Sequence, residues 1–153
     1  MTTTKPHGHE LAEVNVARLR ASLDDPAMAS FVRAIADVNW LAEQSPGFVW
    51  RHRADPEPVA YGALPGEDNL IVTMSTWEDV DSLRNFVTRT AHGLFMRKRL
   101  RWFLPIPGHT TALWWVAPSD HPSIADALAR LEHLRTHGPS PEAFSFRQVF
   151  DEP

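Results

Sequence analysis

The chain has 153 residues, of which 43% are hydrophobic and 22% charged, and its formal net charge is −4. These values are ordinary for one globular domain, and the mild negative charge gives no general attraction to nucleic acid or anionic membranes. The lack of cysteine excludes disulfides, thiolate catalysis and cysteine-ligated metals, and no apolar run of about 18 residues could span a membrane.

The first residues predict a tail followed by a strand. Residues 1–9 are polar and are expected to form a flexible tail, so that residues 10–153 make up a single domain. Apolar and polar residues alternate over 10–17, which predicts a strand with one apolar face and one mixed face. Glu13 and Asn15 lie on the mixed face.

The next segment predicts a helix and a second strand. Asp25 before Pro26 is typical of a helix start, because aspartate caps free backbone N–H groups and proline suits the first helical position. An apolar stripe at helical spacing runs on until Ser45, whose position before Pro46 disfavours the helix. Residues 48–53 then predict a strand, and a proline-rich loop follows.

A third strand over 69–77 is predicted to lead directly into a second helix. Thr76 and Asp79 are spaced as in a capping box, which would close the helix start. Beyond that helix, another helical piece begins at His92 and carries Arg97 within a short basic run. We expect a small pocket where this strand and these helices meet.

The last third predicts a strand over 112–117, a helix over 123–137 and a terminal strand over 144–150. The order β-α-β-β-α-β, followed by an extra helix and strand, is the ferredoxin-like α+β pattern with helices on one face of an antiparallel sheet. The mixed face with Glu13 and Asn15 is expected to be the other face. Packing two such faces together in a twofold-symmetric homodimer would cover them and leave a cavity.

Several segments give the chain a resemblance to the dimeric α+β barrel superfamily, which includes the antibiotic biosynthesis monooxygenases. These segments are Ser75-Thr76-Trp77, Glu78-Asp79, Leu83, Phe86 and Arg89-Thr90-Ala91-His92. The chain resembles more closely an uncharacterised bacterial family within it, through the segments LAEVNVARLRASLDDP, VTMSTWEDVDSLRNFV, the run from Arg97 to Phe103, LWWVAP and LEHLRTHGPSPEAFSFR. The resemblance implies the dimeric barrel fold. Relatives include cofactor-independent oxygenases, isomerising or ring-forming enzymes and haem enzymes, among which the fold does not choose.

The family resemblance and the alternation along the first strand together indicate three candidate catalytic residues. In the superfamily a histidine after this helix often faces the pocket, and His92 holds the matching position. His92 could act as an acid or base or could bind haem iron, and the alternative is a helix-capping role. If the mixed strand face lines a cavity, desolvation would raise the pKa of Glu13, and Asn15 could orient a substrate. The alternative for both residues is a solvated strand edge or a dimer hydrogen bond.

Large aromatic and basic side chains are candidates for substrate binding. Trp77, Trp102, Trp114 and Trp115 could bracket a flat ligand, although core packing is the competing interpretation for each. Trp114 and Trp115 are adjacent on a strand and must point to opposite faces, so one of them belongs to the core. Arg97 could contact an anionic group, or it could lie on a solvated helix face.

No metal and no organic cofactor are expected. His133 and His137 are four residues apart on a helix, but the chain lacks the zinc-protease pattern around them. The sequence also lacks a glycine-rich phosphate loop, a dinucleotide fingerprint and a serine elbow. Haem held by His92 stays open as an alternative.

We expect an enzyme of bacterial, secondary metabolism that acts on a small hydrophobic molecule, aromatic or polyketide-like. The reaction would be a cofactor-independent oxygenation, an isomerisation or a cyclisation, with His92 as acid or base and Glu13 and Asn15 beside it. The alternatives are a noncatalytic ligand-binding dimer and a haem-binding enzyme. The expected location is cytoplasmic, without a nucleic-acid or membrane partner.

Overall fold

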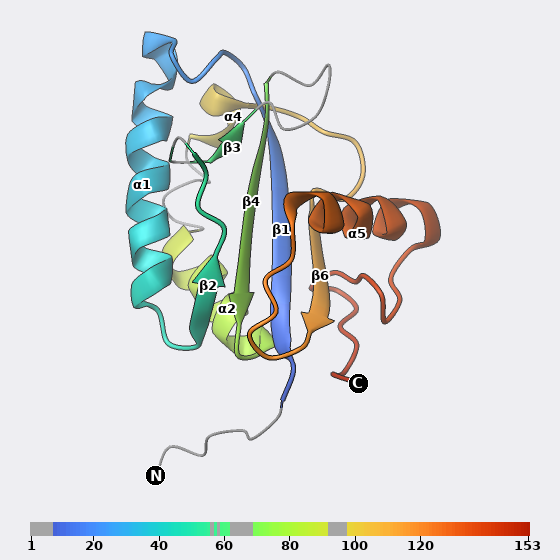
Figure 1. Ribbon diagram of the computed structural model, residues 1–153. Coiled ribbons are helices and arrows are strands. Elements are labelled where there is room, and N and C mark those ends of the chain that lie inside the picture. The colour runs from blue at the N-terminus through green and yellow to red at the C-terminus, as the bar shows by residue number, and fades with distance from the viewer. Residues whose placement is uncertain (1–7, 56, 58, 62–68, 92–97) are drawn as a thin grey trace.

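The computed structural model describes residues 8–55, 57, 59–61, 69–91 and 98–153 (Figure 1). The elements follow along the chain as β1 (Glu10–Leu19), the 3-10 turn η1 (Pro26–Met28), α1 (Ala29–Gln44), β2 (Phe48–Arg51), β3 (Ala60–Tyr61), β4 (Leu70–Trp77), α2 (Val80–Phe86), the π-helical turn η2 (Val87–Ala91), α4 (Arg99–Trp102), β5 (Phe103–Leu104), β6 (Thr111–Val116) and α5 (Ile124–His137). The predicted α+β class and the ferredoxin-like order β-α-β-β-α-β are confirmed by β1, α1, β2, β4, α2 and β6.

β1 lies at the centre of one antiparallel sheet, with β4 on one side and both β6 and the short β5 on the other. β2 and β3 pair with the outer edge of β4. In this register Glu13 lies opposite Ser75 of β4 and Leu113 of β6, and Arg51 of β2 also lies opposite Ser75. Directly opposed residues point to the same face, so Arg51, Ser75 and Glu13 form one row across the sheet.

Helices cover both faces of this sheet (Figure 1). α1 and α2 are crossover connections between parallel strands, and the common right-handedness of such connections puts both on one face. There they pack on side chains such as Leu11, Leu19 and Trp77. α5 lies across the opposite face, where it packs on a cluster that includes Ala12, Val14, Val16, Val72, Met74, Ala112 and Trp114.

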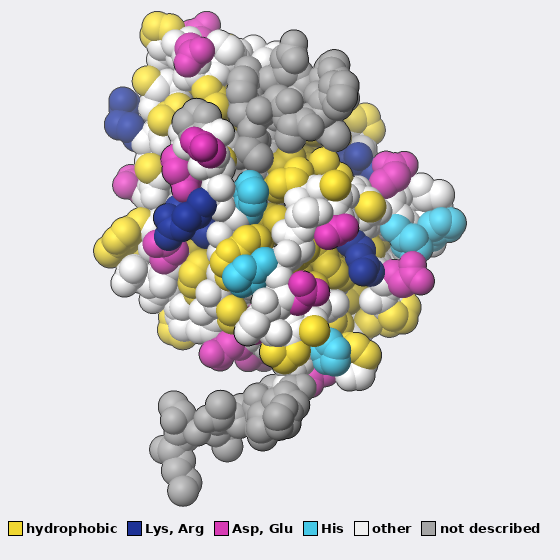
Figure 2. Space-filling model, in the orientation of Figure 1, with side chains coloured by type: hydrophobic (Ala, Val, Ile, Leu, Met, Phe, Trp, Pro, Cys, Tyr) yellow, Lys and Arg dark blue, Asp and Glu magenta, His cyan; other side chains and the backbone are white. Residues whose placement is uncertain are grey.

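The predicted assignment of the two sheet faces is wrong. The sequence predicts that the mixed face with Glu13 and Asn15 carries no helix, yet this face lies beneath α1 and α2. The apolar face packs on α5 of the same chain. Charged side chains of both signs are interspersed with apolar ones on the outer surface around α5 (Figure 2), as on ordinary solvent-exposed surfaces. The homodimer therefore stays a prediction that no longer follows from an uncovered sheet face.

Short-range signals locate most helix ends. Asp25 caps η1, which precedes α1, as the sequence predicts. Ser123 caps α5, at the start of the helix predicted over 123–137. The predicted capping box of Thr76 and Asp79 is wrong, because β4 continues through Thr76 to Trp77. Asp79 is itself the N-cap of α2, and its carboxylate accepts a hydrogen bond from the Ser82 backbone N–H at 2.7 Å.

The predicted terminal strand is replaced by an irregular segment. Phe144 forms a single antiparallel bridge with Leu113, and the rest of the segment packs as a loop. Phe144 is buried in the core cluster beside α2, and Phe146 and Phe150 pack against the same cluster. The indole N–H of Trp115 donates to the Phe150 carbonyl at 2.8 Å, which fastens this segment to β6.

Candidate active site

A cavity of about 650 Å³ lies between the mixed face of the sheet and helix α1. β1 and β4 contribute the polar side chains Glu13, Asn15, Thr73 and Ser75 to its lining. Most of the other lining residues are apolar, and four of them are the phenylalanines Phe31, Phe86, Phe103 and Phe146. A volume of several hundred cubic ångströms with apolar walls and a few convergent polar groups is typical of a small-molecule site.

Glu13 is the ionisable group at the centre of this lining. Its Oε2 accepts a hydrogen bond from Ser75 Oγ at 3.0 Å. The side chain keeps some accessible surface where it borders the cavity, but the surrounding protein still removes most of the water from its charge. This burial raises the pKa of Glu13 to about 7, against the smaller opposing effect of the Ser75 hydrogen bond. Both charge states are therefore accessible near neutral pH.

Ser75 Oγ, which donates to Glu13, also accepts a hydrogen bond. The indole Nε1–H of Trp77 donates to Ser75 Oγ at 2.9 Å. Trp77 has no exposed surface, and its ring stacks on Phe86 and meets Phe48 edge-on. The lining residue Ser75 is thus fixed from the core side by a rigid, buried ring.

Asn15 borders the cavity two residues along β1 from Glu13. Its Oδ1 accepts a hydrogen bond from Thr111 Oγ1 of β6 at 3.2 Å. That bond orients the amide and leaves its N–H₂ group, a donor, for a ligand oxygen. The predicted pairing of Glu13 and Asn15 on one strand face is therefore present at the cavity.

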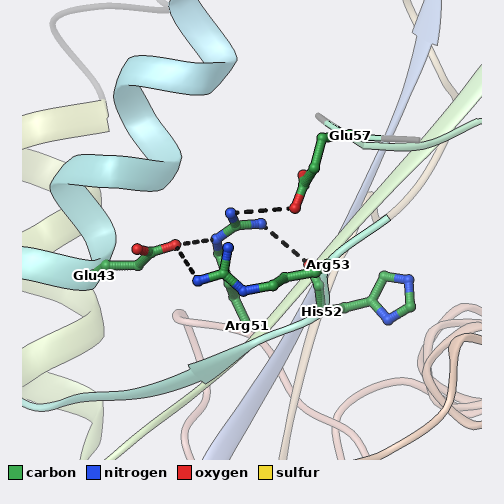
Figure 3. A network of polar contacts seen from close by, with 5 residues as sticks. All are labelled: Glu43, Arg51, His52, Arg53 and Glu57. Atoms are coloured by element: carbon green, nitrogen blue, oxygen red, sulfur yellow. Dashed lines mark hydrogen bonds and ion pairs between the residues drawn. The ribbon is translucent and has the colours of Figure 1, made fainter. Parts of the chain in front are cut away.

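Arg51 is the cation nearest to Glu13 along the cross-strand row, but it is already paired. Its Nε donates to Glu43 Oε1 of α1 at 2.6 Å, and its Nη2 is 3.4 Å from Glu57 Oε1. Arg53 also contacts Glu43, at 3.2 Å, and Arg51 Nη1 donates to the His52 backbone carbonyl at 3.4 Å, whereas the His52 ring points away from this network (Figure 3). Arg51 in turn lowers the pKa of Glu43. Burial rather than a neighbouring charge therefore sets the pKa of Glu13.

None of the four predicted tryptophans is among the cavity-lining residues. Trp77, Trp102 and Trp114 are buried core residues, and Trp114 faces α5 on the other side of the sheet. Trp115 is half-buried beside the C-terminal segment, so the two adjacent rings do point to opposite faces. The aromatic walls are phenylalanines instead. Helical stripes predict the burial of Phe31 and Phe86 but carry no sign that these side chains border a cavity.

The family was determined by comparison with known proteins. A family model described as a domain of unknown function, DUF3291, matches residues 10–153. The chain belongs to this family. The predicted resemblance to an uncharacterised family is thereby confirmed. A search among curated proteins found no match to this DUF3291 chain.

Two solved structures are similar to this DUF3291 protein in fold. SnoaB from Streptomyces nogalater, a cofactor-independent oxygenase, is 16% identical, with 76% of this chain and 97% of that chain covered and a TM-score of 0.49. NE2512 from Nitrosomonas europaea, of unknown function, is 12% identical, with 76% and 96% covered and a TM-score of 0.49. At these identities and TM-scores the likeness carries no conclusion about activity.

Two of the predicted site residues, His92 and Arg97, lie outside the described residues. The proposed acid–base or haem-ligand role of His92 and the anion contact of Arg97 therefore stay predictions. Nearby, Arg99 and Leu100 of α4 border the cavity.

The two helical histidines of the DUF3291 chain are engaged in other contacts. His133 Nε2 lies 2.8 Å from Glu142 Oε2, and its ring centroid is 4.6 Å from that of His137. Across the described ranges, no group of three His, Asp or Glu side chains is arranged to hold a metal ion. Within the same ranges, none of the helices has the length and apolar character needed to cross a membrane.

Proposed function

We propose that this DUF3291 protein is an enzyme that transfers a proton on a small hydrophobic substrate, with Glu13 as the acid–base group. The observation that carries the proposal is the Glu13 carboxyl in an apolar cavity, with a pKa raised by burial to about 7. A general base works best when its pKa lies near the working pH, and its strength increases when water is excluded. Perturbed carboxyls in clefts are typical of catalytic sites.

The lining supports a flat, mainly apolar carbonyl compound as substrate, aromatic or polyketide-like. Phenylalanine side chains offer ring faces and edges to such a molecule. The Asn15 amide could donate to the substrate carbonyl oxygen, because its own oxygen is occupied by Thr111. Glu13 would then remove a proton from the carbon next to the carbonyl, and the negative charge would move onto the carbonyl oxygen as an enolate.

Three outcomes of that enolate fit the same site. In an isomerisation, the substrate also carries a neighbouring C=C bond, the negative charge spreads over the resulting dienolate, and protonated Glu13 returns the proton to the far carbon while the double bond shifts. In a cyclisation, the enolate carbon bonds to a second carbonyl carbon, whose oxygen takes the proton. In an oxygenation, the enolate carbon is oxidised by O₂ to a hydroperoxide, which loses water and leaves a new carbonyl. The electrons pass from substrate to O₂, so this route requires no organic cofactor.

The proposal is tested by hydrogen exchange of weak carbon acids. The probes are 2-tetralone and 2-indanone, whose acidic C–H groups exchange with D₂O and are followed by proton NMR, with an oxygen electrode in parallel. The protein should accelerate exchange, with a rate that rises with pH through a midpoint near 7. Glu13→Gln should lower the rate by about 100-fold, the contribution typical of a general base.

The matched control is Glu132→Gln, an exposed carboxyl on α5, beyond the other face of the sheet. It should leave the exchange rate unchanged. Failure of the unaltered protein to accelerate exchange of any probe, or an equal rate in Glu13→Gln, would overturn the proposal. Saturable probe binding without exchange would instead establish a noncatalytic binding protein.

A further inference from the structure

We propose that Ser75 and Trp77 are positioning residues that form a one-way hydrogen-bond chain onto Glu13, so that Oε2 is occupied and Oε1 is the atom that exchanges the proton. This inference rests on the proposed role of Glu13. Neither Ser75 nor Trp77 needs to touch the substrate. Their action is through the orientation and charge of the Glu13 carboxyl.

The direction of the chain follows from the chemistry of its first member. An indole N–H is a donor only, so Ser75 Oγ must accept from Trp77 at 2.9 Å. The Ser75 hydroxyl hydrogen is then available to Glu13 Oε2 at 3.0 Å, and an ionised carboxylate can only accept. The order Trp77 to Ser75 to Glu13 is therefore fixed, without the freedom of rotation that a serine hydroxyl usually has.

The sheet holds the three groups in place. Ser75 and Trp77 are two residues apart on β4 and so point to the same face. Glu13 lies directly opposite Ser75 in the β1–β4 register. Trp77 lies opposite Leu11 and Phe48 and has no exposed surface, so its ring cannot leave the chain without disturbing the core. Rigid support of this kind is what keeps a catalytic group within the narrow range of productive geometry.

The second carboxyl oxygen has a different environment. Among the described residues only Oε2 has an observed hydrogen bond, the one from Ser75. The Glu13 side chain is half-buried and borders the cavity, so Oε1 is the carboxyl oxygen that this bond leaves for a bound molecule. Because Oε2 keeps accepting from Ser75, a proton taken from the substrate should bind at Oε1. All proton transfers would then occur on one face of the bound molecule.

The chain also tunes the basicity of Glu13. A hydrogen bond donated to the charged form stabilises that form, so Ser75 lowers the pKa that burial raises. Ser75→Ala should therefore move the pKa of Glu13 upward, and the pH midpoint of probe exchange should move to higher pH with it. Ser75→Thr retains a hydroxyl on a residue that suits a strand, and should restore the midpoint.

A spectrum of the tryptophan indole groups tests the chain without any substrate. The protein has six tryptophans, whose Nε1–H groups give separate peaks in a ¹⁵N–¹H correlation spectrum. The Trp77 peak is assigned through its contacts to the Phe48 and Phe86 rings. It should shift with pH around a midpoint near 7 in the unaltered protein, and should stop shifting in Glu13→Gln. In Ser75→Ala the peak should lose this response, while Ser75→Thr should keep it.

Trp102 provides the matched control, because its indole N–H also donates to a serine, Ser30 Oγ at 3.0 Å. Among the described residues, no observed hydrogen bond connects that serine to a carboxyl. Its peak should not follow the Glu13 midpoint. A Trp77 peak that ignores pH, or a Ser75→Ala variant with an unchanged exchange midpoint, would overturn the chain. A titrating Trp77 peak without probe exchange would leave the chain standing and remove the proposed function.

Discussion

Replacing Glu13 by glutamine is expected to stabilise the protein above pH 7 and to leave its stability near pH 4 almost unchanged. Burial raises the pKa of Glu13 from about 4.5 to about 7, so in that interval the folded protein binds a proton that the unfolded chain has released. Stability therefore falls as the pH rises through this window. The shift corresponds to at most about 3 kcal/mol, which glutamine should recover because it carries no charge.

Urea unfolding of both proteins, followed by tryptophan fluorescence, measures this effect at about pH 4 and about pH 8.5. Glu43→Gln is the control of opposite sign. Arg51 lowers the pKa of Glu43, so its contribution is present above the ordinary pKa and is lost as the pH falls through the folded value. Glu43→Gln should therefore destabilise the protein at the higher pH. A Glu13→Gln effect that is equal at both pH values would show that Glu13 is not desolvated.

Glu13 lowers the stability of the protein at neutral pH, so its presence in the cavity is not explained by a contribution to folding. A glutamine or an apolar side chain at position 13 would fill the same strand position without a desolvated charge. Arg51, which could neutralise Glu13 from two strands away, is instead held by Glu43 and Glu57. Loss of stability at a polar group inside an apolar cavity is the trade-off expected of a functional site.

The local structure could be predicted from the sequence, whereas the partners of each sheet face could not. Alternation along β1 correctly separates Glu13 and Asn15 from Val14 and Val16, because the side-chain period of a strand is fixed by its geometry. It does not say which helix covers which face. α5, more than one hundred residues further along the chain, packs on the apolar face, and no short-range signal indicates that contact.

For the candidate site, the sequence predicted single residues but not the hydrogen bonds between them. The raised pKa of Glu13 follows from placing a carboxyl at a cavity, and the sequence supports that expectation. The hydrogen-bond chain does not follow, because the Glu13–Ser75 bond joins residues 62 positions apart and depends on the exact β1–β4 pairing. The prediction that the tryptophans line the cavity is wrong, because one property fits two locations. Their size makes them candidates for a ligand wall, but the same size favours the core, where Trp77, Trp102 and Trp114 lie.

Gly47→Ala is expected to destabilise the protein by about 3 kcal/mol, the sum of backbone strain and overpacking. Gly47 has a φ of +83° in the turn between α1 and β2, and an added Cβ would lie 2.1 Å from Ser82 Oγ and 2.4 Å from Ser82 Cβ. The Ser82 Cβ is attached to the α2 backbone, so relief would require α2 to move. α2 carries Leu83 and Phe86 of the cavity lining, and any such movement should also slow probe exchange.

Gly108→Ala separates the two causes of that loss. Gly108 has a nearly equal φ of +79°, but nothing lies within 4 Å of an added Cβ. It should therefore show the backbone strain alone, about 1 kcal/mol in urea unfolding. The double variant Gly47→Ala with Ser82→Gly removes the opposing Cβ, and should recover part of the difference between the two alanine variants. An equal decrease in the free energy of unfolding for Gly47→Ala and Gly108→Ala would mean that α2 can move away from the added Cβ without destabilising the protein. The turn would then not set the position of the cavity wall.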